Sequence, residues 1–189
     1  LKKILELSNK LEIYDEIPEL LSVTLGSAET TLIKLTSAYG SFVNGGNKIE
    51  TNLISRIQDR RGKTIFKLKN KECVGCDKFL SESTDYPIIR YNNERILSKE
   101  TAYQITSILE GAVKRGTAKK LRDMKVPIAG KTGTTNNNYD AWFIGFTSDL
   151  VIGVYVGFDS PQSLGKYETG SKAALPIFKD FVKNAIFKE

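Results

Sequence analysis

Histidine is absent from the 189 residues, and cysteine occurs only twice. Without histidine the chain has neither a Ser-His-Asp triad nor a histidine-ligated metal site. No stretch approaches the roughly 20 consecutive apolar residues of a membrane-spanning helix, and no signal peptide is recognisable. We therefore expect no cofactor, and contact with a membrane only through an anchor outside these residues. Since the first residue is Leu1 rather than Met, the chain is interpreted as a processed product or a fragment.

The two cysteines lie close together, in the run Cys73-Val74-Gly75-Cys76. A structural zinc ion needs about four ligands, so this pair supplies half of one site. A thioredoxin-like redox pair would stand at a strand-to-helix junction of a βαβ unit, whereas this pair stands in a polar, lysine-rich stretch. The pattern favours a local disulfide or a reduced loop pair, and leaves a redox site and a zinc ion shared between chains as alternatives.

Charge is abundant by contrast, and 28 Lys and Arg against 22 Asp and Glu give a net charge of +6. Both signs are mixed along the chain, which is typical of an ordinary solvated surface. Attraction to an anionic surface, such as phospholipid headgroups or an anionic wall polymer, is the alternative. No basic stripe with interleaved aromatic side chains occurs, so nucleic acid is not an expected partner.

Three helices are predicted in the first two thirds of the chain. Apolar residues at spacings of three and four predict a short helix over 1–11 and a longer one that begins at Leu32. The longer helix is expected to end at Asn44-Gly45-Gly46, because glycine readily adopts the left-handed conformation that terminates a helix. A further helix is predicted between a capping Ser98 and a terminating Gly116.

Between these helices, residues 49–57 and 63–68 are predicted to form the two strands of a hairpin. The following stretch, 69–98, is polar and is interpreted as an irregular surface insert that contains the cysteine pair. The whole chain, 1–189, is therefore expected to form one domain, with the hairpin and insert of 49–98 inside it.

The last third of the chain predicts a sheet with a helix packed on it. Residues 127–135 are extended and rich in glycine and threonine. The segments 141–147 and 150–158 are predicted to form an antiparallel hairpin that is apolar on both faces, which favours a sheet covered on both sides. An amphipathic helix follows Ser171, and Pro176 must lie in its first turns or kink it. The fold class is therefore α+β.

One short motif carries chemistry, namely Lys131-Thr132-Gly133-Thr134. A Lys-Thr-Gly triplet alone is a weak signal, because such common residues often meet by chance. Here the motif lies on a short predicted strand, and a polar turn and the apolar run Asp140–Gly145 follow it. In this setting it resembles the third active-site motif of the penicillin-binding proteins and serine β-lactamases.

The resemblance extends along most of the chain. Class A penicillin-binding proteins have similar segments in the same order. In this sequence the segments are Leu25-Gly26-Ser27, Ala38-Tyr39, Phe42-Val43-Asn44-Gly45-Gly46, Arg115-Gly116-Thr117-Ala118 and 169–176. It implies the C-terminal part of a transpeptidase domain, with a partial β-lactamase/transpeptidase-like fold and a helical subdomain. The first two strands of the family's sheet are expected upstream, which would leave the strand 150–158 with an open edge. The cysteine insert does not belong to the family's general pattern.

The resemblance also implies an activity. The family's transpeptidases cross-link peptidoglycan stem peptides ending in D-Ala-D-Ala by serine acyl transfer, outside the bacterial inner membrane. They also bind β-lactams. The expected partners are therefore stem peptides, β-lactams and the upstream part of the same protein. A β-lactamase-type hydrolase and a non-catalytic fragment of a split or decayed gene are the alternatives.

Each motif residue receives a role from this resemblance. Lys131 would supply positive charge, and the hydroxyls of Thr132 and Thr134 would donate to the substrate carboxylate. Gly133 would let the substrate backbone approach as an added strand. The backbone N–H of Thr134 would form half of the oxyanion hole. Because alternate residues of a strand point to opposite faces, the cleft is expected at the strand's edge. Trp142 is predicted to pack on the sheet, with a role in the cleft wall as the alternative.

The family's nucleophile motif, Ser-x-x-Lys, has one match here, at Ser163–Lys166. It follows the Lys-Thr-Gly motif and lies in a glycine-containing loop, so we interpret it as a chance match. The second motif, Ser-x-Asn, does not occur, and Tyr91-Asn92-Asn93 has only its form and falls in the insert. The nucleophile is therefore expected upstream of Leu1.

Overall fold

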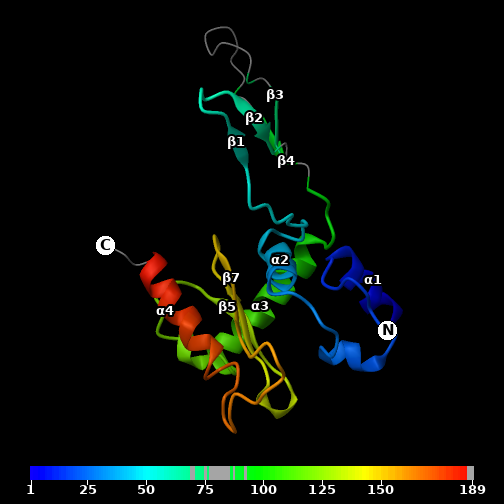
Figure 1. Cartoon of the computed structure of the whole chain (residues 1–189), viewed down its shortest axis with the longest axis vertical. Coiled ribbons are helices and arrows are strands. Elements are labelled where there is room, and N and C mark those ends of the chain that lie inside the picture. The colour runs from blue at the N-terminus through cyan, green and yellow to red at the C-terminus, as the bar shows by residue number, and fades with distance from the viewer. Residues whose placement is uncertain (69–70, 75, 77–85, 87, 92, 187–189) are drawn as a thin grey trace. The chain divides into compact units, whose positions relative to one another are not determined.

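The computed structural model divides into two compact units (Figure 1). The larger unit contains Leu1–Ile49 and Arg95–Glu189, and the smaller contains Glu50–Glu94. The residues that the structure describes are 1–68, 71–74, 76, 86, 88–91 and 93–186.

The larger unit is built on a three-stranded antiparallel sheet. Its strands β5 (Ala129–Thr134), β6 (Ala141–Phe146) and β7 (Val151–Val156) follow the order β5-β6-β7. The tight turn between β6 and β7 is closed by Thr147, whose hydroxyl oxygen accepts the N–H groups of Asp149 and Leu150. The predicted hairpin is confirmed, and β5 is added to it along β6.

Helices cover both faces of this sheet, as the two-sided apolar pattern of the strands predicted. Helix α2 (Leu32–Val43) packs on β7, where Gly153 leaves room for Thr36 and Leu32 of the helix. Helix α4 (Ala174–Ile186) packs on β6 and β7 from the other face. Helix α3 (Lys99–Arg115) packs on β5 and on α2.

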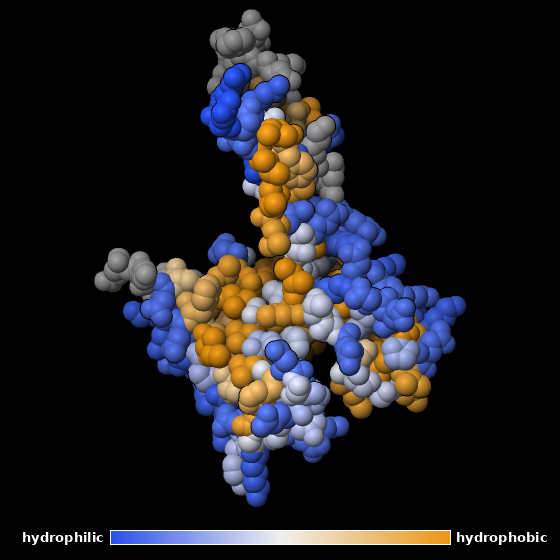
Figure 2. Space-filling view, in the orientation of Figure 1, coloured by the Kyte–Doolittle hydropathy of each residue, from blue (hydrophilic) through white to orange (hydrophobic). Residues whose placement is uncertain are grey.

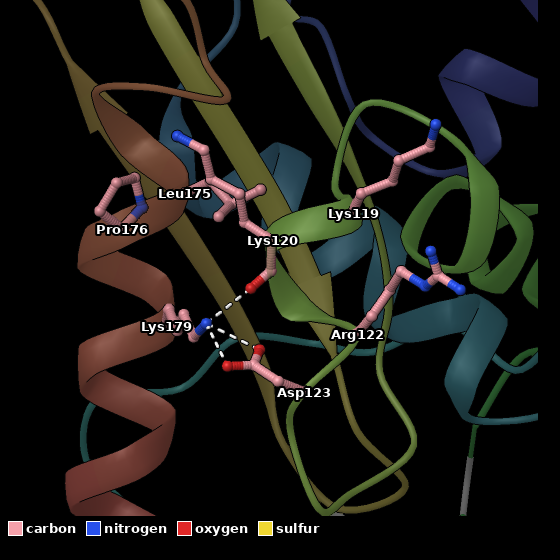
Figure 3. A pocket seen from close by; sticks show the side chains of 7 residues that line it. All are labelled: Lys119, Lys120, Arg122, Asp123, Leu175, Pro176 and Lys179. Carbon is pink, nitrogen blue, oxygen red and sulfur yellow. Dashed lines mark hydrogen bonds and ion pairs between the residues drawn. The ribbon is translucent and has the colours of Figure 1, made fainter.

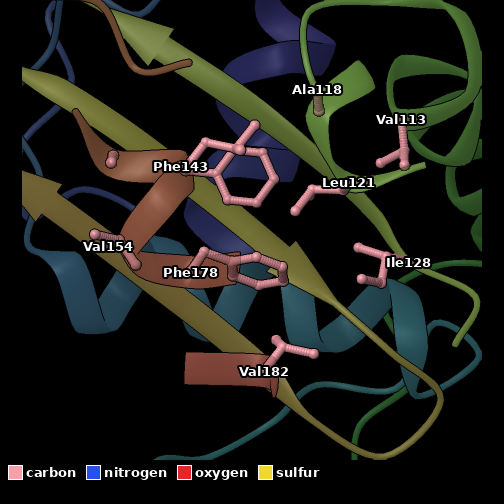
Figure 4. Close-up of a cluster of buried hydrophobic side chains, with 10 residues drawn as sticks. Val113, Ala118, Leu121, Ile128, Phe143, Val154, Phe178 and Val182 are labelled. Atoms are coloured by element: carbon pink, nitrogen blue, oxygen red, sulfur yellow. The ribbon is translucent and has the colours of Figure 1, made fainter. Parts of the chain in front are cut away.

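The hydrophobic core lies between the sheet, α4 and the segment that follows α3 (Figure 4). The rings of Phe143 on β6 and Phe178 on α4 meet edge to face, with centroids 4.8 Å apart, and both are fully buried. Leu121, from the short helix η2 (Lys119–Leu121), closes the cluster on the α3 side. Burial of each such large side chain stabilises the fold by roughly 1.5–3 kcal/mol.

The helix ends follow the capping signals in the sequence. The hydroxyl of Ser98 accepts the N–H of Thr101 at 3.1 Å and begins α3, which ends at Gly116. The hydroxyl of Thr31 accepts the N–H of Lys34 and begins α2. Pro176 is the third residue of α4, where a missing N–H costs no intrahelical bond. The predicted helices are therefore confirmed.

The N-terminal part of the larger unit contains α1 (Lys2–Lys10) and the short helix η1 (Leu21–Leu25). Ion pairs of Lys34 with Asp15 and of Lys48 with Glu12 connect this segment to α2 and to the residues after it. No helix within the described ranges has the length and apolarity that crossing a bilayer requires.

The smaller unit contains the predicted hairpin, with β1 (Arg56–Gln58) and β2 (Thr64–Lys67) antiparallel. The carboxylate of Asp59 organises the turn by accepting the N–H groups of Arg61 at 2.8 Å and Lys63 at 2.9 Å. The prediction of a strand over 49–57 was wrong for its first part, because β1 begins only at Arg56. Polar residues dominate 50–52, and β2 ends before it reaches them.

The description of 69–98 as irregular was also wrong. Strand β3 (Lys71–Val74) pairs antiparallel with β4 (Ile88–Tyr91), so the insert contains a second hairpin. Cys73, within β3, forms a disulfide with Cys76, just after its end, which agrees with the prediction of a local pair. The cysteine lies opposite Ile89, a residue type that favours strands.

Candidate active site

The motif residues all lie on β5, an edge strand that pairs with β6 alone among the described strands. Just beyond this strand the N–H of Thr135 donates to the carbonyl of Asp140 at 3.1 Å. This bond shows which residues of β5 direct their backbone groups toward β6. Because backbone groups alternate in direction along an antiparallel strand, those of Lys131 and Gly133 point to β6. Those of Thr132 and Thr134 point to the free edge.

Side chains alternate in the same way between the two faces of the sheet. Thr132 lies opposite Phe143 and belongs to the face that carries the hydrophobic core. Gly133 lies opposite Trp142 and belongs to the other face, together with Lys131. A ligand that is to meet both sets of side chains must therefore bind along the edge of β5.

The hydroxyl of Thr132 is bonded within the chain. Its oxygen lies 2.8 Å from the hydroxyl oxygen of Thr117, which follows the end of α3. Because α3 packs on β5, the hydroxyl of Thr117 reaches the strand although Thr117 lies 15 residues before Thr132 in the sequence.

The hydroxyl of Thr134 is bonded to a residue that follows it in the sequence, whereas the partner of Thr132 precedes it. The N–H of Gly170 donates to the Thr134 hydroxyl at 3.0 Å. Gly170 lies against the strand backbone so closely that a side-chain carbon there would collide with the carbonyl oxygens of Trp142 and Gly133. Because the Thr134 oxygen already accepts this bond, its own proton remains available for a ligand.

Lys131 reaches around the edge of the strand. Its ammonium donates to the carbonyl of Thr132 at 2.7 Å, and that carbonyl is one of the groups directed to the free edge. The side chain is exposed. A positive charge therefore lies where an added peptide strand would make its backbone hydrogen bonds.

The model of the penicillin-binding protein transpeptidase domain matches residues 16–183. The chain belongs to this transpeptidase family. The α+β arrangement agrees with the β-lactamase/transpeptidase-like fold that the sequence implied.

Penicillin-binding protein 1A of Rickettsia typhi is 44% identical over 98% of this chain and 24% of that protein. Penicillin-binding protein 1A of Neisseria meningitidis is 35% identical over 90% of this chain and 20% of that protein. Among solved structures, penicillin-binding protein 1A from Haemophilus influenzae has a TM-score of 0.80 at 32% identity, covering 99% of this chain and 30% of that one. The chain thus spans about a quarter of the length of the curated relatives that it matches.

Trp142 packs on the transpeptidase sheet. Its ring lies 4.7 Å from that of Tyr155, directly across from it on β7. The Tyr155 hydroxyl donates to Asp140 at 2.8 Å. This hydrogen bond raises the pKa of Tyr155, because loss of the phenolic proton would place two negative charges side by side. The geometry matches the preferred prediction for Trp142.

Ser163, which begins the one Ser-x-x-Lys run of the sequence, has a structural role in the loop after β7. Its hydroxyl donates to the carbonyl of Asn137 at 2.8 Å and accepts the N–H of Gly165. The Asn138 amide donates to the carbonyls of Gly165 and Lys166. The asparagines after β5 therefore form a turn and fix this loop.

A cavity of about 420 Å³ lies between η2 and α4, and none of the motif residues lines it (Figure 3 shows the residues that do). Its lining residues are Lys119, Lys120, Arg122, Asp123, Leu175, Pro176 and Lys179. The Lys179 ammonium donates to both oxygens of Asp123 and to the carbonyl of Lys120. That hydrogen bond, with the charge of Lys179, lowers the pKa of Asp123. The cavity thus contains an ion pair that joins the segment just after η2 to α4.

Sequence reasoning gave no role to two residues that touch the motif, Thr117 and Gly170. Both lie in segments that resemble the family, so the sequence did mark their neighbourhoods. Their contacts with the motif could not be predicted, because nothing in the sequence pattern shows that the end of α3 and the loop before α4 lie against β5.

Proposed function

We propose that this chain forms the carboxylate-binding side of the active site of a peptidoglycan D,D-transpeptidase. The observation that carries the proposal is the free edge of β5, which presents the hydroxyls and backbone N–H groups of Thr132 and Thr134 together. Membership of the transpeptidase family and the identity to penicillin-binding protein 1A of Rickettsia typhi support it.

In the proposed reaction a serine hydroxyl attacks the carbonyl carbon between the two D-Ala residues of a stem peptide. The tetrahedral oxyanion collapses, the C–N bond breaks, and D-Ala leaves with the proton transferred to its amine. The amine of a second stem peptide then attacks the serine ester, which forms the cross-link and returns the proton to the serine. A β-lactam would acylate the same serine by opening its ring.

The residues of β5 act on this substrate in three ways. The N–H of Thr134 donates to the oxyanion as it forms. The hydroxyls of Thr132 and Thr134 donate to the carboxylate of the terminal D-Ala, and the ammonium of Lys131 adds positive potential. The substrate backbone lies along the edge as an added strand, so a substrate N–H replaces Lys131 as the donor to the carbonyl of Thr132.

The nucleophile is proposed to come from sequence that precedes Leu1. The one Ser-x-x-Lys in the chain begins at Ser163, whose hydroxyl is engaged in a loop. The complete protein is proposed to be bifunctional, with a glycosyltransferase domain, and to work on the periplasmic side of the membrane behind an anchor. The named relatives and the quarter of their length that the chain covers support this wider proposal.

Intact-mass measurement with benzylpenicillin tests the proposal. The complete protein should gain one penicilloyl adduct on a serine outside residues 1–189, whereas this chain alone should gain none. The adduct should persist if the protein is a transpeptidase. A β-lactamase-type hydrolase would release it quickly. A stoichiometric adduct on a serine of this chain, or a complete protein that is never acylated, would contradict the proposal.

A further inference from the structure

Either hydroxyl could donate the hydrogen bond between Thr117 and Thr132, but a bound carboxylate decides which one does. Each hydroxyl has one proton to donate and two lone pairs to accept with. An ionised carboxylate only accepts, so Thr132 must spend its proton on that ligand. The bond of 2.8 Å between the two hydroxyls then survives only with Thr117 as the donor. The resulting chain runs from Thr117 to Thr132 to the carboxylate, and each bond polarises the next.

The backbone on both sides of Thr117 is fixed. The N–H groups of Gly116 and Ala118 both donate to the carbonyl of Ala112, each at 3.1 Å. Ala118 is fully buried in the core cluster. Thr117 itself is exposed. The backbone of Thr117 is therefore held in place by its neighbours, although its side chain is exposed and not packed in the hydrophobic core.

Thr134 shows the same arrangement made from the backbone. Its oxygen accepts the N–H of Gly170, so its proton too is left for a ligand. Each of the two motif hydroxyls thus has one bonding partner within the chain. The partner of Thr134 has a fixed polarity, whereas the partner of Thr132 is a side chain that a single substitution removes.

We propose that Thr117 is a positioning residue, which orients the Thr132 hydroxyl so that its proton faces the substrate carboxylate. This inference rests on the proposed transpeptidase function. It predicts that Thr117 influences substrates through their carboxylate and has no effect on the acylation of substrates that lack one.

The test uses the complete protein and measures the second-order rate of acylation by benzylpenicillin and by its methyl ester. Thr117→Val, which keeps the side-chain shape, should slow acylation by the acid about threefold to tenfold, as expected for loss of one hydrogen bond. It should leave the rate with the ester nearly unchanged. Thr117→Ser should restore the rate with the acid. Thr24→Val removes another exposed hydroxyl, which donates to Leu21 in η1, and should change neither rate.

A double variant separates positioning from a general structural effect. Because Thr117 acts through Thr132, adding Thr117→Val to Thr132→Val should cost no further rate. Equal losses with acid and ester, additive losses in the double variant, or an unchanged rate with the acid would each overturn the inference. A wild-type protein that is not acylated overturns the proposed function as well. Normal wild-type acylation with an unaffected Thr117→Val variant overturns the role of Thr117 alone.

Discussion

The two units of this chain are stabilised in different ways. In the larger unit every residue of β6 except Trp142 is buried, and helices cover the sheet on both faces. In the smaller unit every residue of β1 and β2 is exposed, and the described contacts are the pairing of strands within two hairpins, a side-chain-organised turn and a disulfide. The first unit depends on tertiary burial, whereas the second depends on local bonds. The comparison teaches that the candidate site needs the first kind of support, since both partners of its hydroxyls come from distant segments.

Removing a core ring should show the largest difference between the units. Phe178→Ala, at a fully buried position, should lower the free energy of unfolding by about 3–5 kcal/mol, because it deletes packing and leaves a cavity. The matched change in the smaller unit is Ile65→Ala, at a position 69% exposed, and should stay within about 0.5 kcal/mol. Chemical denaturation of the two variants measures both. Comparable losses would show that the smaller unit has a core of its own.

The next largest effect should be on catalysis and confined to the larger unit. Thr132→Val in the complete protein should slow acylation by penicillin about tenfold or more, since a hydrogen bond to a charged group is worth roughly 1.5–3 kcal/mol. Arg60→Ala, in the turn of the smaller unit, should leave the rate unaltered. Stopped-flow or quenched-flow acylation measures both. An unaltered rate for Thr132→Val would exclude this hydroxyl from carboxylate binding.

Opening the disulfide should produce a smaller effect that stays in the smaller unit. Cys73→Ser together with Cys76→Ser removes a short closed loop, which is worth about 2 kcal/mol by chain entropy. Amide hydrogen exchange in β3 and β4 should accelerate, while exchange in β6 should be unchanged. Hydrogen-exchange mass spectrometry resolves the two regions. Faster exchange in β6 would mean that the units unfold together.

The smallest effect concerns the ion pair of the larger unit. The pKa of Asp123 is lowered in the folded chain, so its contribution to stability is complete at neutral pH. That contribution is lost as the pH falls from the ordinary carboxyl range, about 4, through the lowered pKa. Thermal melts of the wild-type chain and of Asp123→Asn between pH 7 and pH 3 test this. The difference between their melting temperatures should shrink with acid; a constant difference would contradict the assignment.

Local patterns predicted the elements of the larger unit well. Its helices α2 and α3 begin at capping hydroxyls and carry apolar residues at helical spacing, and β6 and β7 are apolar throughout. The sequence failed where pairing is not local. Strand β3 meets β4 across an intervening polar segment. The stretch 50–55 was predicted as strand, but β1 begins only at Arg56, and of this stretch Ser55 alone accepts a backbone hydrogen bond from the described part of the facing segment, at Leu68.

In the candidate site, too, local sequence predicted some residues, and those that depend on non-local packing were missed. Its four motif residues were identified through a resemblance, because a Lys-Thr-Gly triplet has no distinctive pattern of its own. The partners Thr117 and Gly170 depend on how α3 and the loop before α4 pack against β5. Such contacts follow from tertiary packing and have no periodicity to read.

The position of Gly170 also sets the order in which the site is completed during synthesis. Thr117 is already made when Thr132 is added, so the partner of the first hydroxyl precedes it in the chain. The N–H that holds Thr134 lies 36 residues later in the chain. At about 5–20 residues per second, the ribosome adds that glycine roughly 2–7 seconds after the threonine. The hydrogen bond to Thr134 therefore cannot form until the segment that leads into the last helix has been made.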